Sequence, residues 1–174
     1  NSTINNINTI ALDLQYGSSL IENNDIINAK IGVSCYNTSS NTINCNRIRA
    51  PFHKTVFNSN YGIACTRCSD VFYNTEIWDC TTGIYVFIGP AAPTIESNYI
   101  HDILEQGIKT YIQETYTMVV NNNTFHKNGV AIDFTQGNTL SNNVITSCQL
   151  GVLSSIVNVD HNLFYNCAQN FSLF

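Results

Sequence analysis

The chain has 174 residues, enough for one domain with a packed core and too few for two comfortable ones. Only 11% of the residues are charged, and the formal net charge of −5 reflects seven Lys and Arg against twelve Asp and Glu. So few basic residues argue against a nucleic-acid binder, because neutralising phosphates requires clustered Lys and Arg. The longest nearly apolar run, from Gly83 to Pro93, contains two prolines and is too short to cross a bilayer, so no membrane span is expected.

A short motif returns along the chain at intervals typical of a solenoid. In the stretch "NNVITSCQLGVLSS", which begins at Asn142, Asn143 is followed by Ile145, Cys148 and Gly151. Equivalent Gly or Asn residues recur 19 to 30 residues apart, and the first thirty residues, around "NNINTIALDL", suggest a degenerate first coil. Such a period predicts stacked repeats rather than a globular mixture of elements.

The later coils align on three columns, taken here in chain order. The Asn column is Asn24, Lys54, Thr75, Asn98, Asn123, Asn143 and Asn162. The apolar column two places later is Ile26, Val56, Ile77, Ile100, Phe125, Ile145 and Phe164, and the column three places earlier is Ile21, Pro51, Phe72, Ile95, Val120, Leu140 and Val159. Because Lys54 interrupts the Asn column, we expect a local difference in the longest coil, with "NRIRAPFHK" as its loop.

Within each coil the apolar residues alternate in short runs, and no helical i, i+3, i+4, i+7 series is sustained. The pattern predicts an all-β fold in which each coil holds three short strands and stacks about 4.8 Å above the previous one. We therefore expect a single parallel β-helix domain over residues 1–174, with about seven to eight coils. A further column is expected to mark turns, because Gly and Asn tolerate positive φ: Gly32, Gly62, Gly83, Gly107, Gly129, Gly151 and Asn170.

The stretch "NNVITSCQLGVLSS" resembles the N-x-I-x-x-N/C-x-x-G-I-x-L repeat of right-handed parallel β-helix proteins in the pectin lyase-like superfamily, which includes NosD-type and surface proteins. The resemblance covers nearly the whole chain and implies right-handed coiling. It is specific for fold rather than for activity, since pectate lyases, polygalacturonases, alginate epimerases and phage tailspikes share the architecture.

The Asn column is interpreted as a ladder of side-chain amides that bond to the coils above and below. Among the seven cysteines, "CTRC" from Cys65 to Cys68 favours a structural role over redox or metal chemistry, because no second pair or nearby His completes a site. Cys35 with Cys65, and Cys148 with Cys167, fall in adjacent coils where a disulfide is feasible, but buried free thiols are the preferred interpretation. No metal or cofactor is expected, and Ca²⁺ would enter only if the protein were a lyase.

The outward position three after the Asn column is the most informative one. It reads Ile27, Phe57, Trp78, His101, His126, Thr146 and Tyr165. Phe57, Trp78, His101 and His126 predict a partly aromatic strip along one sheet, widened by Tyr99 and Glu76. A glycan, a protein partner or a covering loop would each suit such a strip. Arg47, Arg49, His53 and Lys54 form either a solvated basic loop or a contact for an anionic glycan.

A catalytic alternative uses Asp79, His101, Asp102, His126 and Lys127, the densest group of acids, imidazoles and amines. Adjacent strand residues point to opposite faces, which weakens a joint role for His101 and Asp102. The G-H-G and R-x-K segments of polygalacturonases and the D-P-H-D of alginate epimerases are absent. The segment from Arg47 to Lys54 resembles the R-x-P-x-x-R stretch of pectate lyases but lacks the second Arg.

The leading hypothesis is a non-catalytic extracellular or cell-surface β-helix, adhesin-like or fibre-forming, that binds a glycan or a protein chain along one sheet face. The alternative is a polysaccharide lyase or glycoside hydrolase of the same superfamily. Sequons at Asn1, Asn37, Asn122 and Asn170 would suit a secreted protein. Because solenoid ends need caps and no capping helix is evident, we expect a segment of a larger protein or an end-to-end homo-oligomer or filament.

Overall fold

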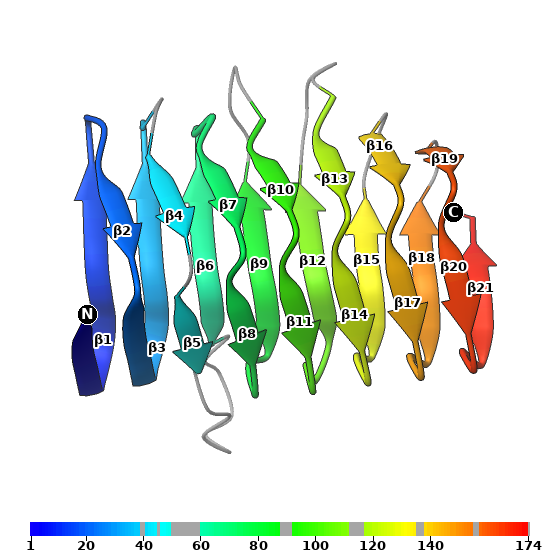
Figure 1. The fold of residues 1–174 in the computed structure, drawn as a ribbon, viewed down its shortest axis with the longest axis horizontal. Coiled ribbons are helices and arrows are strands. Elements are labelled where there is room, and N and C mark those ends of the chain that lie inside the picture. The colour runs from blue at the N-terminus through cyan, green and yellow to red at the C-terminus, as the bar shows by residue number, and fades with distance from the viewer. Residues whose placement is uncertain are drawn as a thin grey trace.

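The chain winds into a solenoid of parallel strands (Figure 1). The computed structural model describes residues 1–38, 41–44, 46–49, 60–87, 92–111, 117–134, 138–154 and 157–173. These residues form 21 strands and no helix. The predicted all-β parallel β-helix is therefore confirmed.

Each coil contributes one strand to each of three faces. The seven-stranded sheet consists of β2 (Leu20–Glu22), β4 (Thr42–Asn44), β7 (Val71–Tyr73), β10 (Thr94–Glu96), β13 (Val119–Asn121), β16 (Asn138–Ser141) and β19 (Val157–Asp160). The short-strand face consists of β5 (Arg47–Arg49), β8 (Glu76–Trp78), β11 (Tyr99–His101), β14 (Thr124–His126), β17 (Val144–Thr146) and β20 (Leu163–Tyr165). The long-strand face consists of β6 (Tyr61–Thr66), β9 (Thr82–Phe87), β12 (Gln106–Tyr111), β15 (Val130–Phe134), β18 (Leu150–Ser154) and β21 (Gln169–Ser172).

Two long strands open the solenoid and join two of its faces. β1 (Ser2–Gln15) pairs with β3 (Asn24–Tyr36), and β3 pairs with both β5 and β6. The short-strand and long-strand faces therefore belong to one 14-stranded sheet. Six complete turns separate the first and last of the seven strands in the other sheet.

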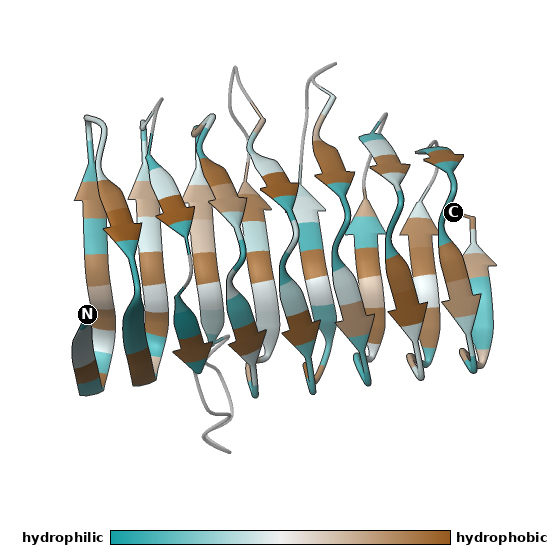
Figure 2. Ribbon diagram, in the orientation of Figure 1, coloured by the Kyte–Doolittle hydropathy of each residue, from teal (hydrophilic) through white to brown (hydrophobic). Residues whose placement is uncertain are grey.

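The core is a set of columns, one residue per coil. Ile26, Ile77, Ile100, Phe125 and Ile145 are fully buried beneath the short-strand face, as the alternation predicted. A second column is fully buried beneath the seven-stranded sheet and includes Phe72, Ile95, Val120 and Leu140. Figure 2 shows the corresponding alternation of hydrophobic and hydrophilic residues along the strands.

The predicted frame of the longest coil is wrong. Ile43 pairs with Phe72 and Ile48 with Ile77, so these two residues occupy the core positions assigned to Pro51 and Val56. The ladder position is Asn46 rather than Lys54, because the Asn46 Oδ1 accepts a hydrogen bond from the backbone N–H of Asn24 at 3.0 Å. The extra residues follow β5 instead of preceding the Asn, and Lys54, His53 and Phe57 lie outside the described residues.

The predicted amide ladder is present. Asn98 Nδ2 donates to Asn123 Oδ1 at 3.0 Å, Asn123 Nδ2 to Asn143 Oδ1 at 3.1 Å, and Asn143 Nδ2 to Asn162 Oδ1 at 2.9 Å. Each oxygen also accepts the backbone N–H of the preceding ladder residue, as Asn123 Oδ1 does from Asn98 at 2.9 Å. Thr75 interrupts the ladder because its side chain has no amide. Its hydroxyl donates instead to the Tyr73 carbonyl in its own coil.

The glycine column has a different cause from the one predicted. None of the described glycines has a φ in the left-handed region, and most of the column lies inside strands. What these positions require is space: a Cβ on Gly62 would lie 2.5 Å from Ile77 Cγ2 and 2.7 Å from the Gly83 carbonyl oxygen. Gly129 is outside the column, because Gln106 pairs with Val130 and Ile108 with Ile132, which places Ala131 beside Gly107.

Positive φ belongs instead to three corner positions. One directly precedes the ladder residue, at Asn23, Asn74, Ser97, Asn122, Asn142 and His161. The second follows the short strands, at Asp79, Asp102, Lys127, Ser147 and Asn166, and at Asn28 within β3. The third follows the first long strands, at Tyr16, Asn37 and Arg67. Asn, Asp and Ser are frequent here because their short polar side chains tolerate or bridge such turns.

Removing one rung of the ladder should destabilise the fold. Asn123→Ala removes the oxygen that accepts from both the backbone N–H and the side-chain amide of Asn98, and only the side-chain amide keeps another acceptor, the Phe72 carbonyl. An unsatisfied buried group costs about 1–3 kcal/mol. We expect a loss of roughly 3 kcal/mol or more in the free energy of unfolding, measured by urea titration. The exposed Asn158→Ala should change it by less than about 0.5 kcal/mol. Equal effects of the two variants would contradict the ladder.

The glycine explanation is tested by adding one methyl group at two positions. Gly62→Ala should cost about 1–3 kcal/mol, because the new Cβ meets backbone and a core side chain. Gly17→Ala should be neutral or slightly stabilising, since nothing lies within 4 Å of its Cβ position. Thermal unfolding followed by circular dichroism would distinguish them, and a stable Gly62→Ala protein would refute the spatial account.

Candidate functional site

The short-strand face holds the predicted outward column in register. Arg49 pairs with Trp78, Trp78 with His101, and His101 with His126. Arg49 thus stands where Phe57 was predicted, as a consequence of the shifted frame. The structure brings together Trp78, Tyr99, His101, His126, Arg47 and Arg49 on this face.

The aromatic rings of this face lie close together. The Tyr99 ring stacks on the His101 ring with centroids 4.2 Å apart. The Trp78 and His101 rings are nearly parallel, at an interplanar angle of 3° with centroids 6.1 Å apart. The Arg47 guanidinium lies 5.4 Å from the centre of the Trp78 ring, within the range of a cation–π contact.

Ion pairs run between the same strands. Arg47 Nε contacts Glu76 Oε2 at 3.1 Å, and Arg49 contacts Asp79 Oδ2 at 2.7 Å. His101 Nε2 lies 3.3 Å from Glu76 Oε1, and its Nδ1 lies 2.7 Å from Asp102 Oδ2. These groups are partly exposed, so each pair adds little stability, but together they hold Trp78 and His101 in one orientation.

The predicted catalytic residues separate into two places. Asp79, Asp102 and Lys127 line a groove of about 490 Å³ at the corner that follows the short strands, beside Ser147 and Gln149. All three adopt positive φ, which turns the chain away from the strand. His101 and His126 remain on the sheet face, and Asp102 links the groove to the imidazole of His101.

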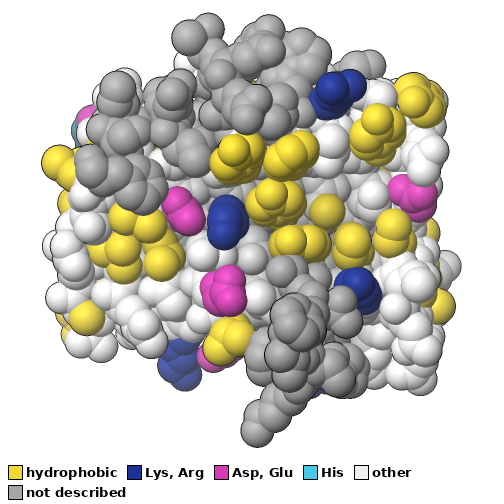
Figure 3. Space-filling model, turned by 180° about the vertical axis from the view of Figure 1, so that it is seen from behind, with side chains coloured by type: hydrophobic (Ala, Val, Ile, Leu, Met, Phe, Trp, Pro, Cys, Tyr) yellow, Lys and Arg dark blue, Asp and Glu magenta, His cyan; other side chains and the backbone are white. Residues whose placement is uncertain are grey.

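A second aromatic cluster lies on the long-strand face and was not predicted (Figure 3). The rings of Tyr61 and Tyr85 stack at 5.0 Å, and those of Phe87 and Tyr111 at 5.6 Å. Burial raises the pKa of Tyr85, and the neighbouring Tyr61 and Tyr111 raise it further. A signal for this cluster was present in the sequence. The second residue after each Gly of the column, such as Tyr85 after Gly83, alternates with the core residues and is not part of the core pattern.

Two charged residues share this second face. Lys109 pairs in register with Asp133 on the next strand. Burial raises the pKa of the Asp133 carboxyl, and the charge of Lys109 opposes that shift. Both side chains are half-buried.

The model of the right-handed β-helix region matches residues 1–150. The chain belongs to the right-handed β-helix family. No curated protein matches it. Family membership gives the hand of the coil, and it leaves the side chains of the faces and corners as the guide to function.

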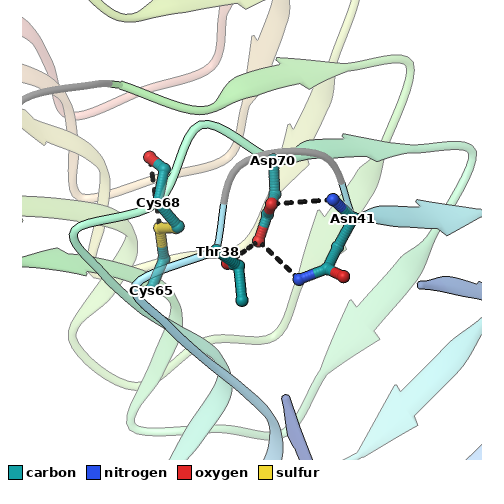
Figure 4. The surroundings of a disulfide bond; sticks show 5 residues. All are labelled: Thr38, Asn41, Cys65, Cys68 and Asp70. Carbon is teal, nitrogen blue, oxygen red and sulfur yellow. Dashed lines mark hydrogen bonds between the residues drawn. A yellow bond between two sulfur atoms is a disulfide. The ribbon is translucent and has the colours of Figure 1, made fainter. Parts of the chain in front are cut away.

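The β-helix contains a disulfide that the sequence analysis did not favour. Cys65 and Cys68, with Cα atoms 6.0 Å apart, are joined at the corner that follows β6 (Figure 4). Cys35 pairs in register with Cys65 but is a free, buried thiol. The preference for buried free thiols is therefore wrong for Cys65 and right for Cys35 and Cys148, while Cys167 is free but only partly buried. Cys45 lies outside the described residues.

A buried carboxylate supports the corner beside this disulfide (Figure 4). Asp70 accepts hydrogen bonds from Thr38 Oγ1 at 2.6 Å and from the backbone and side-chain amides of Asn41 at 2.9 and 3.2 Å. Burial raises the pKa of Cys35 well above its ordinary value, and the charge of Asp70 adds to the shift. These contacts give Asp70 a structural role at this corner.

Metal clusters and membrane-spanning helices are both missing from the part of the chain that the structure describes. Among those residues, no group of three or more His, Cys, Asp and Glu could hold a metal ion. The described strands and loops likewise include no helix able to span a membrane.

The cysteines should differ in reactivity with an alkylating agent. Cys65 and Cys68 are expected to be labelled only after reduction, because they share a disulfide. Burial raises the pKa of Cys148 to about 11, so at pH 8 only about one thiol in a thousand is the reactive thiolate. Cys148 should react slowly until the protein is unfolded. Peptide mass spectrometry after labelling measures both, and labelling of Cys65 without reductant would contradict the disulfide.

Proposed function

We propose that this β-helix is a non-catalytic extracellular or cell-surface module that binds a neutral glycan along the short-strand face. The observation that carries the proposal is the fixed array of Trp78, Tyr99 and His101 bordered by paired guanidinium and carboxylate groups. The array is assembled before any ligand arrives.

The chemistry of the array suits a sugar. Aromatic rings offer apolar surface to the C–H groups of a pyranose, while carboxylates and guanidinium groups accept and donate hydrogen bonds to its hydroxyls. The same positions recur on neighbouring strands about 4.8 Å apart, so an extended oligosaccharide would meet similar groups along its length. Because the rings and charges already hold one another in place, binding would cost little side-chain entropy.

The charges favour a neutral ligand over an anionic one. Arg47 and Arg49 are both engaged by acids, Glu76 and Asp79, and Asp102 adds a further carboxylate. An anionic glycan would have to displace these partners. An anionic glycan, one of the alternatives predicted for this basic segment, is therefore the less favoured ligand.

Two further features support the rest of the proposal. Both ring nitrogens of His101 face carboxylate oxygens within the protein, so the imidazole serves to position the rings rather than to exchange a proton with a ligand. The Cys65–Cys68 disulfide suits an oxidising, extracellular compartment.

The second candidate is a polysaccharide lyase or glycoside hydrolase. It is favoured by the groove in which Asp79 and Asp102 lie near Lys127, since carboxylates and an amine could serve as acid and base. In such an enzyme Asp102 would serve as the acid or base, and His101 would contact Asp102 from the sheet face.

The test pairs a binding measurement with an activity assay. An array of neutral oligosaccharides should yield a ligand whose affinity, measured by calorimetry, falls about tenfold or more in Trp78→Ala, a loss of about 1.4 kcal/mol. Tyr111→Ala, at an exposed aromatic residue of the long-strand face, is the matched control and should bind normally.

The parent and the triple variant His101→Ala, Asp102→Ala, Lys127→Ala would also be incubated with neutral polysaccharides, polygalacturonate and alginate. Depolymerisation by the parent that is lost in the triple variant would establish the enzyme instead. If no glycan on the array bound, and a protein bound in a manner that depended on Trp78, the ligand of this face would be a protein partner instead of a glycan.

A further inference from the structure

His101 is enclosed by its neighbours on the short-strand face. Its side chain is only 14% exposed, although it stands in the outward column. The Tyr99 ring stacks on the imidazole with centroids 4.2 Å apart, and the Trp78 ring lies parallel to the imidazole from the neighbouring strand. A change in the hydrogen bonds of the imidazole would therefore affect the packing of both rings.

Both ring nitrogens of His101 meet hydrogen-bond acceptors. Nδ1 lies 2.7 Å from Asp102 Oδ2, and Nε2 lies 3.3 Å from Glu76 Oε1. A neutral imidazole has one N–H donor and one lone pair, whereas the imidazolium has two N–H donors. An ionised carboxylate only accepts, so a neutral His101 could bond to one of the two acids and would turn a lone pair toward the other. The charged form satisfies both contacts.

The acid on the neighbouring strand is held in front of the imidazole. Arg47 Nε donates to Glu76 Oε2 at 3.1 Å, which leaves Glu76 Oε1 directed at His101. The Arg47 guanidinium also lies over the Trp78 ring at 5.4 Å. A carboxylate fixed in this way cannot turn away from a neutral imidazole without breaking its contact with Arg47.

The other charged groups near His101 do not reverse this preference. His126 is its register partner on β14 and is followed by Lys127, and both would repel a charged imidazole. The two carboxylates contact the ring directly, and the Coulomb energy falls with distance, so their attraction is the larger effect. Arg49 and Asp79 at the adjacent corner form an ion pair at 2.7 Å and largely cancel each other.

We propose that His101 is a pH-dependent latch, which as an imidazolium holds Trp78 and Tyr99 in their stacked arrangement and releases them when it loses its proton. Because protonation completes both contacts, the array is ordered on the acidic side of the transition and loosens as the pH rises through it. Imidazoles change charge between about pH 5 and pH 8, above the range in which carboxyls such as Glu76 and Asp102 take up protons.

The latch would regulate glycan binding, a consequence that rests on the proposed function. Below the transition a glycan meets an assembled array, and above it binding must also order the Trp78 side chain. Ordering one large side chain lowers an affinity several-fold, so we expect binding about fivefold weaker at about pH 8 than at about pH 5.5. The site would thus hold its ligand more tightly in mildly acidic surroundings.

The ligand-free protein tests the latch directly, because Trp78 is the only tryptophan of the chain. Its fluorescence, excited so that tyrosine does not contribute, should change in one transition between about pH 5 and pH 8. His101→Gln keeps a polar side chain that cannot titrate in this range, and it should abolish the transition. NMR of the histidine rings should show protons on both nitrogens of His101 on the acidic side of the transition.

Two further variants separate the latch from a general effect of pH. Glu76→Gln replaces a carboxylate by an amide that can donate to the neutral imidazole, so the transition should move to lower pH by roughly 0.5 unit or more. His161→Gln is the matched control and should leave the transition unchanged. His161 also contacts a carboxylate, Asp160 Oδ1 at 2.6 Å, but it lies just before β20, beyond β11, β14 and β17 in the sheet order.

Three results would overturn the latch: a parent without the transition, a transition that persists in His101→Gln, or an imidazole with a single ring proton throughout the titration. Calorimetry with the glycan at both pH values separates this proposal from the proposed function. A transition in the ligand-free protein, with no glycan bound at either pH, would refute glycan binding and support the latch. Glycan binding without the fluorescence transition would refute the latch and leave the proposed function standing.

Discussion

The register between successive coils is the constraint on which the rest of the structure depends. Backbone pairing places each residue directly above its counterpart, and the amide ladder holds the corner so that the register does not drift. Asn suits this corner because its one carboxamide can both donate to and accept from neighbouring coils while bonding the backbone. Once the register is set, a column in the sequence becomes a line of side chains on the surface. The surface chemistry can then be deduced from the alignment of the coils.

The sequence was sufficient for the fold because the repeat is carried by buried residues, whose alternation is obvious along the chain. It failed in the longest coil, where Lys54, eight residues before Gly62, was assigned to the Asn column. The segment "NTINCNRIR" supplies Ile43, Asn46 and Ile48 at the right spacing, but a single sequence does not show on which side of a strand an insertion lies. The shift also moved the candidate site, since Arg49 rather than Phe57 stands beside Trp78.

The glycines and cysteines show why a residue type is an incomplete guide to its cause. Gly can be required for positive φ or for close approach, and the two needs look the same in sequence. The structure separates them: Gly62 lies under a neighbouring coil, while Asn and Asp take the left-handed corners. The two stacked pairs drew attention to bonds between coils, whereas the disulfide closes within one corner, between Cys65 and Cys68. Side-chain direction at a corner depends on local φ and ψ, which the repeat pattern does not contain.

The two outer faces use the same register in different ways. On the short-strand face, adjacent strands carry charges that satisfy one another within the chain, which leaves an ordered and nearly neutral surface. On the long-strand face, the stacked rings lie on β6, β9 and β12, and the strands that follow carry Asp133, Leu153 and Ser172 in line with Tyr85. The backbone pairing is the same on both faces, so it does not determine this difference. The repeat fixes the buried columns and leaves the outward positions free to vary, so the chemistry of each face depends on which residue type stands at each outward position.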